Sequence, residues 1–122
     1  MSGVIIAVVD DMFFASKIRA VAEAEGIEIS FPRSREAVVE KAREAKPRLI
    51  VVDLHNQRVE PTDLANDLKA DEELRSIPLL GFFSHVQTEL RRKALEAGFD
   101  EVVPRSVFAR DLPQILATDL HG

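Results

Sequence analysis

Residues 48–54, RLIVVDL, form the stretch that decides the fold, because an apolar run here ends in the carboxylate of Asp53. A run rich in Val and Ile, without a polar residue, is typical of a strand buried on both faces. Residues 4–9, VIIAVV, have the same pattern and lead into Asp10 and Asp11. If the two strands are parallel neighbours, their carboxyl ends lie side by side. The sequence therefore predicts that three acids converge at one edge of a sheet.

The composition predicts one globular domain. A chain of 122 residues can bury a core without a second domain, so we expect a single domain over residues 1–122. The net charge of -5 argues against nucleic acid as a partner, because phosphate contacts need clustered Lys and Arg. The absence of cysteine excludes a disulfide framework and suits a cytoplasmic location. The first apolar run is too short to span a membrane and lacks the basic leader of a signal peptide.

Apolar strand-like runs alternate with helical patterns along the whole chain. Strands are predicted at 4–10, 27–31, 48–53, 77–83 and 101–103, and helices at 12–25, 35–45, 62–70, 88–97 and from about Asp111 onward. Right-handed crossovers place the helices of such a chain on both faces of a parallel sheet. Ligands bind to these sheets outside the carboxyl ends of the strands, where the strand order reverses. The acids and Ser84 follow strand ends at that edge.

The whole chain resembles the receiver domain of two-component response regulators. The resemblance rests on an acidic pair after the first strand, a phosphoacceptor on the third, a hydroxyl after the fourth, a basic residue after the fifth, and a glycine seven positions earlier. These positions are Asp10 and Asp11, Asp53, Ser84, Arg105 and Gly98. The resemblance implies a flavodoxin-like (βα)5 α/β sandwich with the parallel strand order 2-1-3-4-5. It also implies a signalling domain rather than an enzyme.

The resemblance further implies phosphoryl transfer from a sensor histidine kinase or a phosphotransfer protein to Asp53. Because the nucleophile and the phosphoryl group are both anionic, Mg2+ is required, held by one or two carboxylates with water and phosphate oxygens. The implied metal ligands are Asp10, Asp11, Asp53 and the backbone carbonyl of His55. Ser84 and Arg105 would pair with phosphoryl oxygens. A conformational change would then signal to a downstream protein that the sequence does not identify.

The same residues also have purely structural interpretations. Asp11 is a favoured type of helix N-cap, and Ser84 could cap the fourth helix together with Gln87. The remaining alternatives are an ordinary strand-end acid at Asp53, a solvated surface cation at Arg105, and exposed loop histidines at His55 and His85.

Two other functions remain open. One is a degenerate receiver that acts as a phosphorylation-independent interaction module. It is suggested by Arg105, where the family usually has Lys, and by Val102 at the family's aromatic switch position. The other is a metal-dependent hydrolase in which His55 or His85 joins the acids around a transition metal.

Overall fold

The computed structural model describes residues 3–84 and 88–117. Its strands are β1 (Ile5–Val8), β2 (Ile29–Ser30), β3 (Leu49–Asp53), β4 (Leu79–Phe83) and β5 (Glu101–Pro104). Its helices are α1 (Met12–Ala24), α2 (Arg35–Ala45), α3 (Pro61–Ala70), α4 (Thr88–Ala97), α5 (Arg105–Arg110) and α6 (Leu112–Ala117). No helix within these described ranges is both long and apolar enough to cross a bilayer.

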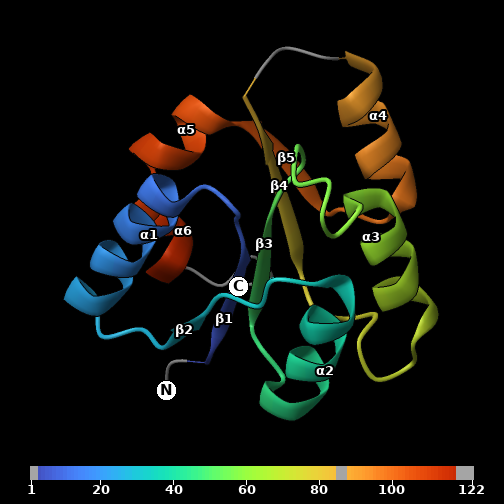
Figure 1. Cartoon of the computed structure of the whole chain (residues 1–122), viewed down its shortest axis with the longest axis horizontal. Coiled ribbons are helices and arrows are strands. Elements are labelled where there is room, and N and C mark those ends of the chain that lie inside the picture. Colours follow the sequence, from blue (N-terminus) through green and yellow to red (C-terminus); the bar gives the residue numbers. More distant parts are fainter. Residues whose placement is uncertain (1–2, 85–87, 118–122) are drawn as a thin grey trace.

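The five strands form one parallel sheet in the order β2-β1-β3-β4-β5 (Figure 1), which confirms the predicted topology. Val8, the last residue of β1, pairs with Val52, so β3 ends one residue beyond β1. Asp53 pairs with Phe82 of β4. This register brings the loops after β1, β3 and β4 to the same edge of the sheet.

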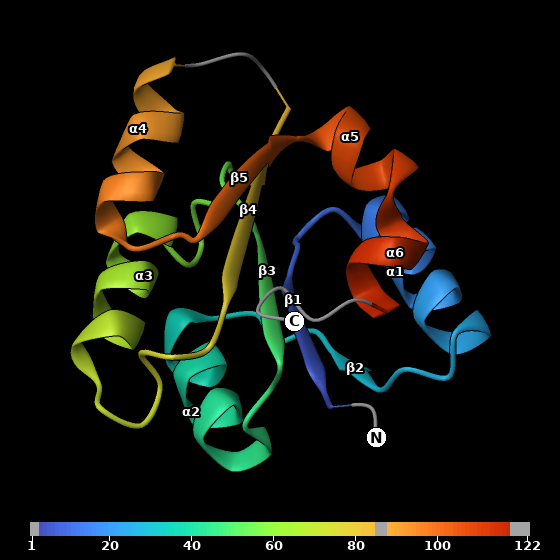
Figure 2. The ribbon, with the colours of Figure 1, turned by 180° about the vertical axis from the view of Figure 1, so that it is seen from behind.

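Helices cover both faces of the sheet, as Figures 1 and 2 show, with α1, α5 and α6 on one side and α2, α3 and α4 on the other. The central strands supply both layers because successive side chains of a strand point to opposite faces. In β3, Ile50 and Val52 pack toward the α2, α3 and α4 side, and Leu49 and Val51 toward the α1, α5 and α6 side. All four residues are buried, which explains why the strand reads as a continuous apolar run.

Local signals fix several helix ends. The Ser34 hydroxyl accepts a hydrogen bond from the Ala37 N–H at 3.0 Å, which confirms the predicted N-cap of α2. Pro61 occupies the first turn of α3, where its missing N–H costs nothing. Gly26 follows α1 with a φ of +69°, the left-handed conformation expected at the end of a helix.

The last predicted helix, from about Asp111, is confirmed as α6, which begins at Leu112. The helix before it, α5, begins at Arg105 and was not predicted. Among the six residues of α5 only Phe108 is buried. One buried residue gives no helical periodicity from which the helix could be predicted. Packing of Phe108 against the sheet therefore decides this helix. The predicted edge strand at 27–31 is also longer than observed, since β2 contains only Ile29–Ser30.

Candidate acidic site

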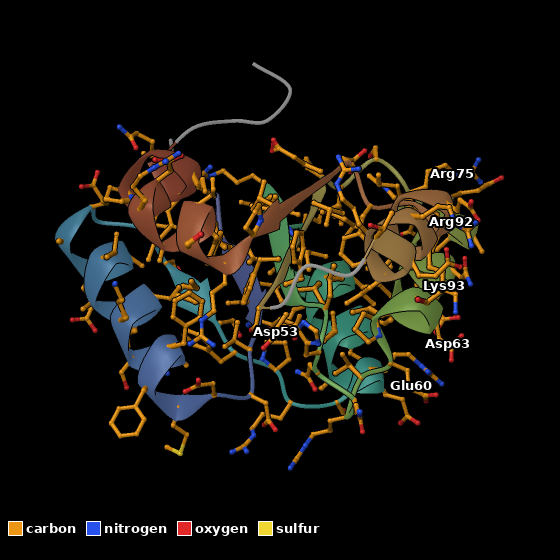
Figure 3. The ribbon with its side chains drawn as sticks, turned by 90° about the horizontal axis from the view of Figure 1, so that it is seen from above. Asp53, Glu60, Asp63, Arg75, Arg92 and Lys93 are labelled. Atoms are coloured by element: carbon orange, nitrogen blue, oxygen red, sulfur yellow. The ribbon has the colours of Figure 1, made fainter. Side chains whose placement is uncertain are left out.

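The acidic residues gather at the carboxyl edge of the sheet. Asp53 is the last residue of β3, and Asp10 and Asp11 follow β1, the neighbouring strand. Seen from above, Asp53 lies near the centre of the molecule, whereas Glu60 and Asp63 lie at its rim (Figure 3). The topology therefore places all three predicted acids at one edge.

Asp53 is held in a defined orientation by the loop that follows it. Its Oδ1 accepts a hydrogen bond from the His55 N–H at 2.9 Å, and its backbone carbonyl accepts one from the Asn56 N–H at 3.0 Å. Asn56 is buried, and its own Oδ1 accepts a hydrogen bond from the Arg58 N–H at 3.1 Å. Such side-chain to backbone bonds shape a turn. The half-buried Asp53 carboxylate thus projects from a structured loop.

Asp11 has two roles at once. Its Oδ1 caps α1 by accepting hydrogen bonds from the N–H groups of Phe13 at 2.9 Å and Phe14 at 3.2 Å. Its Oδ2 accepts a hydrogen bond from Arg105 Nη2 at 3.2 Å. The Phe14 N–H and, next, the Arg105 guanidinium stabilise the charged form and hold the pKa of Asp11 below its ordinary value of 3.8. The N-cap interpretation is therefore right for one oxygen and leaves the other facing a cation.

Arg105 is not a solvated surface cation. It opens α5, and 36% of its side chain is exposed. Its guanidinium carbon lies 4.2 Å from the centroid of the Phe14 ring, so the cation rests on an aromatic face while it contacts Asp11.

Two further arginines at this edge were not singled out in the sequence. Arg33 Nη2 lies 3.4 Å from Asp10 Oδ1, and Arg58 Nε lies 3.9 Å from the same oxygen. Their positions carried a signal, because Arg33 follows the second strand and Arg58 lies in the loop after the third. Both therefore had to emerge near the carboxyl edge. Each of the two acids after β1 thus has an arginine partner.

The other predicted residues are placed less completely. Ser84 follows β4 directly and is exposed at the same edge. Gln87, its suggested capping partner, and His85, a suggested metal ligand, lie outside the described residues. His55 is half-buried, so it is not the exposed loop histidine of the alternative interpretation.

The donor set fits Mg2+ in kind. Within residues 3–84 and 88–117, no three Asp, Glu, His or Cys side chains cluster as ligands of one ion. Magnesium does not need such a cage, because it is usually held by one or two carboxylates and several waters. All the candidate groups are oxygen donors, and Asp11 Oδ2 already accepts a cation in the form of Arg105. An oxygen that a metal would use is thus in contact with an arginine.

The lowered pKa of Asp11 gives a pH prediction. Ionisation of Asp11 favours the folded chain above its ordinary pKa of 3.8, and this contribution disappears as the pH falls through the lower folded pKa. Asp11→Asn removes the charge but keeps a favoured N-cap residue. We expect the difference in unfolding free energy between wild type and Asp11→Asn to be largest near neutral pH and to shrink below about pH 4. Urea unfolding between pH 3 and 7 measures it, and a pH-independent difference would contradict the assignment.

Known proteins resemble this chain in structure but not detectably in sequence. No protein-family model matches the chain, and no curated protein matches it by sequence. Solved structures match it closely. A response regulator from Hahella chejuensis superimposes with a TM-score of 0.86 at 18% identity, covering 98% of this chain and 96% of that one.

Two other solved structures agree. The chemotaxis response regulator CheY4 of Vibrio cholerae has a TM-score of 0.82 at 14% identity, covering 96% of this chain and 98% of its own. The phosphorylated cyanobacterial phytochrome response regulator RcpA has a TM-score of 0.80 at 17% identity, covering 95% and 89%. The chain is thus a doubly wound parallel α/β domain of the flavodoxin-like type. More particularly, it has the fold of the response regulator receiver domain.

Proposed function

We propose that this chain is a receiver-type signalling domain in which Asp53 accepts a phosphoryl group. The observation that carries the proposal is the position of Asp53: it ends the central strand β3, half-buried, at the edge where Asp10 and Asp11 also emerge. The receiver fold supports this assignment, and RcpA, which shares the fold, has been solved in a phosphorylated form.

The residues present suggest how the transfer proceeds. The His55 N–H orients Asp53 through Oδ1, so we assign Oδ2 as the attacking atom. A bond forms between this oxygen and phosphorus while the bond from phosphorus to the donor nitrogen breaks, and the donor imidazole keeps the electron pair and takes up a proton. Bound Mg2+ would supply the charge that offsets repulsion between the carboxylate and the phosphoryl group.

The remaining site residues would stabilise the product. Ser84, exposed after β4, can donate a hydrogen bond to a phosphoryl oxygen. Arg105 can pair with another, at the cost of its contact with Asp11. Asp11 and the His55 carbonyl would hold the metal, with Asp10 adding negative charge behind them. In this proposal the domain relays a signal in the cytoplasm and does not turn over a substrate.

The partner that this proposal requires is a sensor histidine kinase or a phosphotransfer protein. We place its docking surface at the start of α1, where Met12 and Phe13 are 75% and 91% exposed. Exposed large apolar side chains of this kind can contribute to a protein-interaction site. Both residues directly follow Asp11, so a protein docked there would approach Asp53.

A second candidate is a receiver fold that binds a partner without phosphorylation. The contact between Arg105 and Asp11 favours it, because a guanidinium already occupies an oxygen that a metal would need. The two candidates differ in one measurable property, the acceptance of a phosphoryl group by Asp53.

The test is labelling with acetyl phosphate and Mg2+, followed by intact mass measurement. Wild type is expected to gain one phosphoryl group, which hydroxylamine removes because it cleaves acyl phosphates. Asp53→Asn should gain none, because an amide does not attack phosphorus. Asp63→Asn is a matched control, since Asp63 is an exposed acid in the first turn of α3. An unlabelled wild type, or equal labelling of Asp53→Asn, would favour the phosphorylation-independent module.

A further inference from the structure

Arg105 lies between an acid and an aromatic ring. Its Nη2 contacts Asp11 Oδ2 at 3.2 Å, and its guanidinium carbon lies 4.2 Å from the Phe14 ring centroid. A cation over a ring face is attracted by the ring quadrupole, and more strongly where solvent is partly excluded. The side chains of Arg105 and Asp11 are only 36% and 39% exposed. Two attractions therefore hold one guanidinium in one place.

The Phe14 ring is a fixed platform. It is 6% exposed and meets the rings of Phe82 and Phe108 edge-on, with centroid distances of 5.3 Å and 5.8 Å. Phe82 and Phe108 stack on each other with centroids 4.7 Å apart. The three rings come from α1, β4 and α5, so the platform ties together the elements that carry Asp11 and Arg105.

We propose that Phe14 is a positioning residue that holds Arg105 on Asp11, and that Arg105 thereby competes with a divalent cation for the Asp11 carboxylate. The inference rests on the proposed function, since it concerns the metal of the same site. A divalent ion and a guanidinium repel each other and cannot share one carboxylate oxygen at full strength. We therefore expect metal binding to displace Arg105 from Asp11.

If Arg105 competes with the metal, the strength of its contact with Asp11 determines how tightly the metal binds. When only a fraction of molecules is competent to bind, the apparent dissociation constant rises by the inverse of that fraction. Any change that loosens Arg105 from Asp11 should tighten metal binding, even if it leaves every metal ligand untouched. A metal site that is weak only because it has few ligands would not bind the metal more tightly when Arg105 is loosened.

The experiment measures the affinity for Mn2+, a paramagnetic substitute for Mg2+, by water-proton relaxation, with Mg2+ added as competitor. Phe14→Leu removes the ring and keeps both the net charge and an apolar side chain, so we expect about two- to five-fold tighter Mn2+ binding. Arg105→Gln removes the competitor itself, and we expect about three- to thirty-fold tighter binding. Asp11→Asn in either background should abolish the gain.

Two matched variants control for packing and charge. Phe99→Leu makes the same substitution at a buried ring in the core on the other face of the sheet, away from the face that carries Phe14. Arg110→Gln removes a positive charge from α5 at a position paired with Asp111. Neither should change Mn2+ affinity. The proposal is overturned if Phe14→Leu and Arg105→Gln bind Mn2+ like wild type, if the controls tighten it equally, or if no variant binds Mn2+.

The outcome is separable from that of the proposed function. If wild type is labelled on Asp53 and both variants bind Mn2+ like wild type, the competition is refuted and Asp53 remains the phosphoacceptor. If both variants bind Mn2+ more tightly and Asp53 is not labelled, the competition is supported and the role of Asp53 as phosphoacceptor is refuted.

Discussion

Replacing Phe82 with alanine is expected to lower the free energy of unfolding by about 3–5 kcal/mol. Phe82 is fully buried in β4, where its ring contacts both Phe14 and Phe108. Alanine removes a whole ring from the centre of this cluster, and the strands on either side prevent the cavity from collapsing. A domain of ordinary stability would lose a large part of its free energy of unfolding. Urea unfolding followed by circular dichroism measures the loss.

Phe13→Ala is the matched control, because it is the same substitution at an exposed phenylalanine. Phe13 is 91% exposed, so its replacement should change the unfolding free energy by no more than about 0.5 kcal/mol. Equal costs for Phe82→Ala and Phe13→Ala would show that the aromatic cluster does not stabilise the domain.

The sheet could be predicted from the sequence because strands buried on both faces appear there as continuous apolar runs. The apolar runs in β1 and β3 are long enough to be recognised as strands, and each ends in a carboxylate. Parallel order then determines where those carboxylates emerge, without any knowledge of side-chain conformation. The location of Asp10, Asp11 and Asp53 at one edge followed from topology alone.

The partners of these acids could not be predicted in the same way. Arg33 and Arg58 reach Asp10 from two different loops, and the paths of those loops depend on turn geometry rather than on hydrophobic period. The contact between Arg105 and Phe14 joins residues 91 positions apart, and it exists only because α5 begins immediately after β5. The resemblance identified Arg105 as the basic residue of the site. It did not predict that Arg105 would contact Asp11 and the Phe14 ring.

Gly98 was matched to a family glycine by spacing, and the structure supplies a physical reason for it. Its φ is +125°, a backbone conformation that residues with a Cβ rarely adopt. A Cβ at this position would also lie 2.6 Å from Lys69 Cγ. Lys69 cannot easily move away, because its Nζ donates hydrogen bonds to the carbonyls of Arg75 at 3.0 Å and Ile77 at 3.3 Å. The glycine thus lets the end of α4 pack closely against α3.

Gly98→Ala is therefore expected to lower the unfolding free energy by about 2–4 kcal/mol, through backbone strain together with displacement of Lys69. The two causes can be separated. In Lys69→Ala/Gly98→Ala the clash is gone and the backbone strain remains, so the double variant should be more stable than the two single losses added together predict. We expect a coupling of about 0.5–3 kcal/mol from urea unfolding of all four proteins. Strict additivity would mean that Lys69 is not in the way of the new methyl group, and a neutral Gly98→Ala would mean that the left-handed backbone at this position carries no strain.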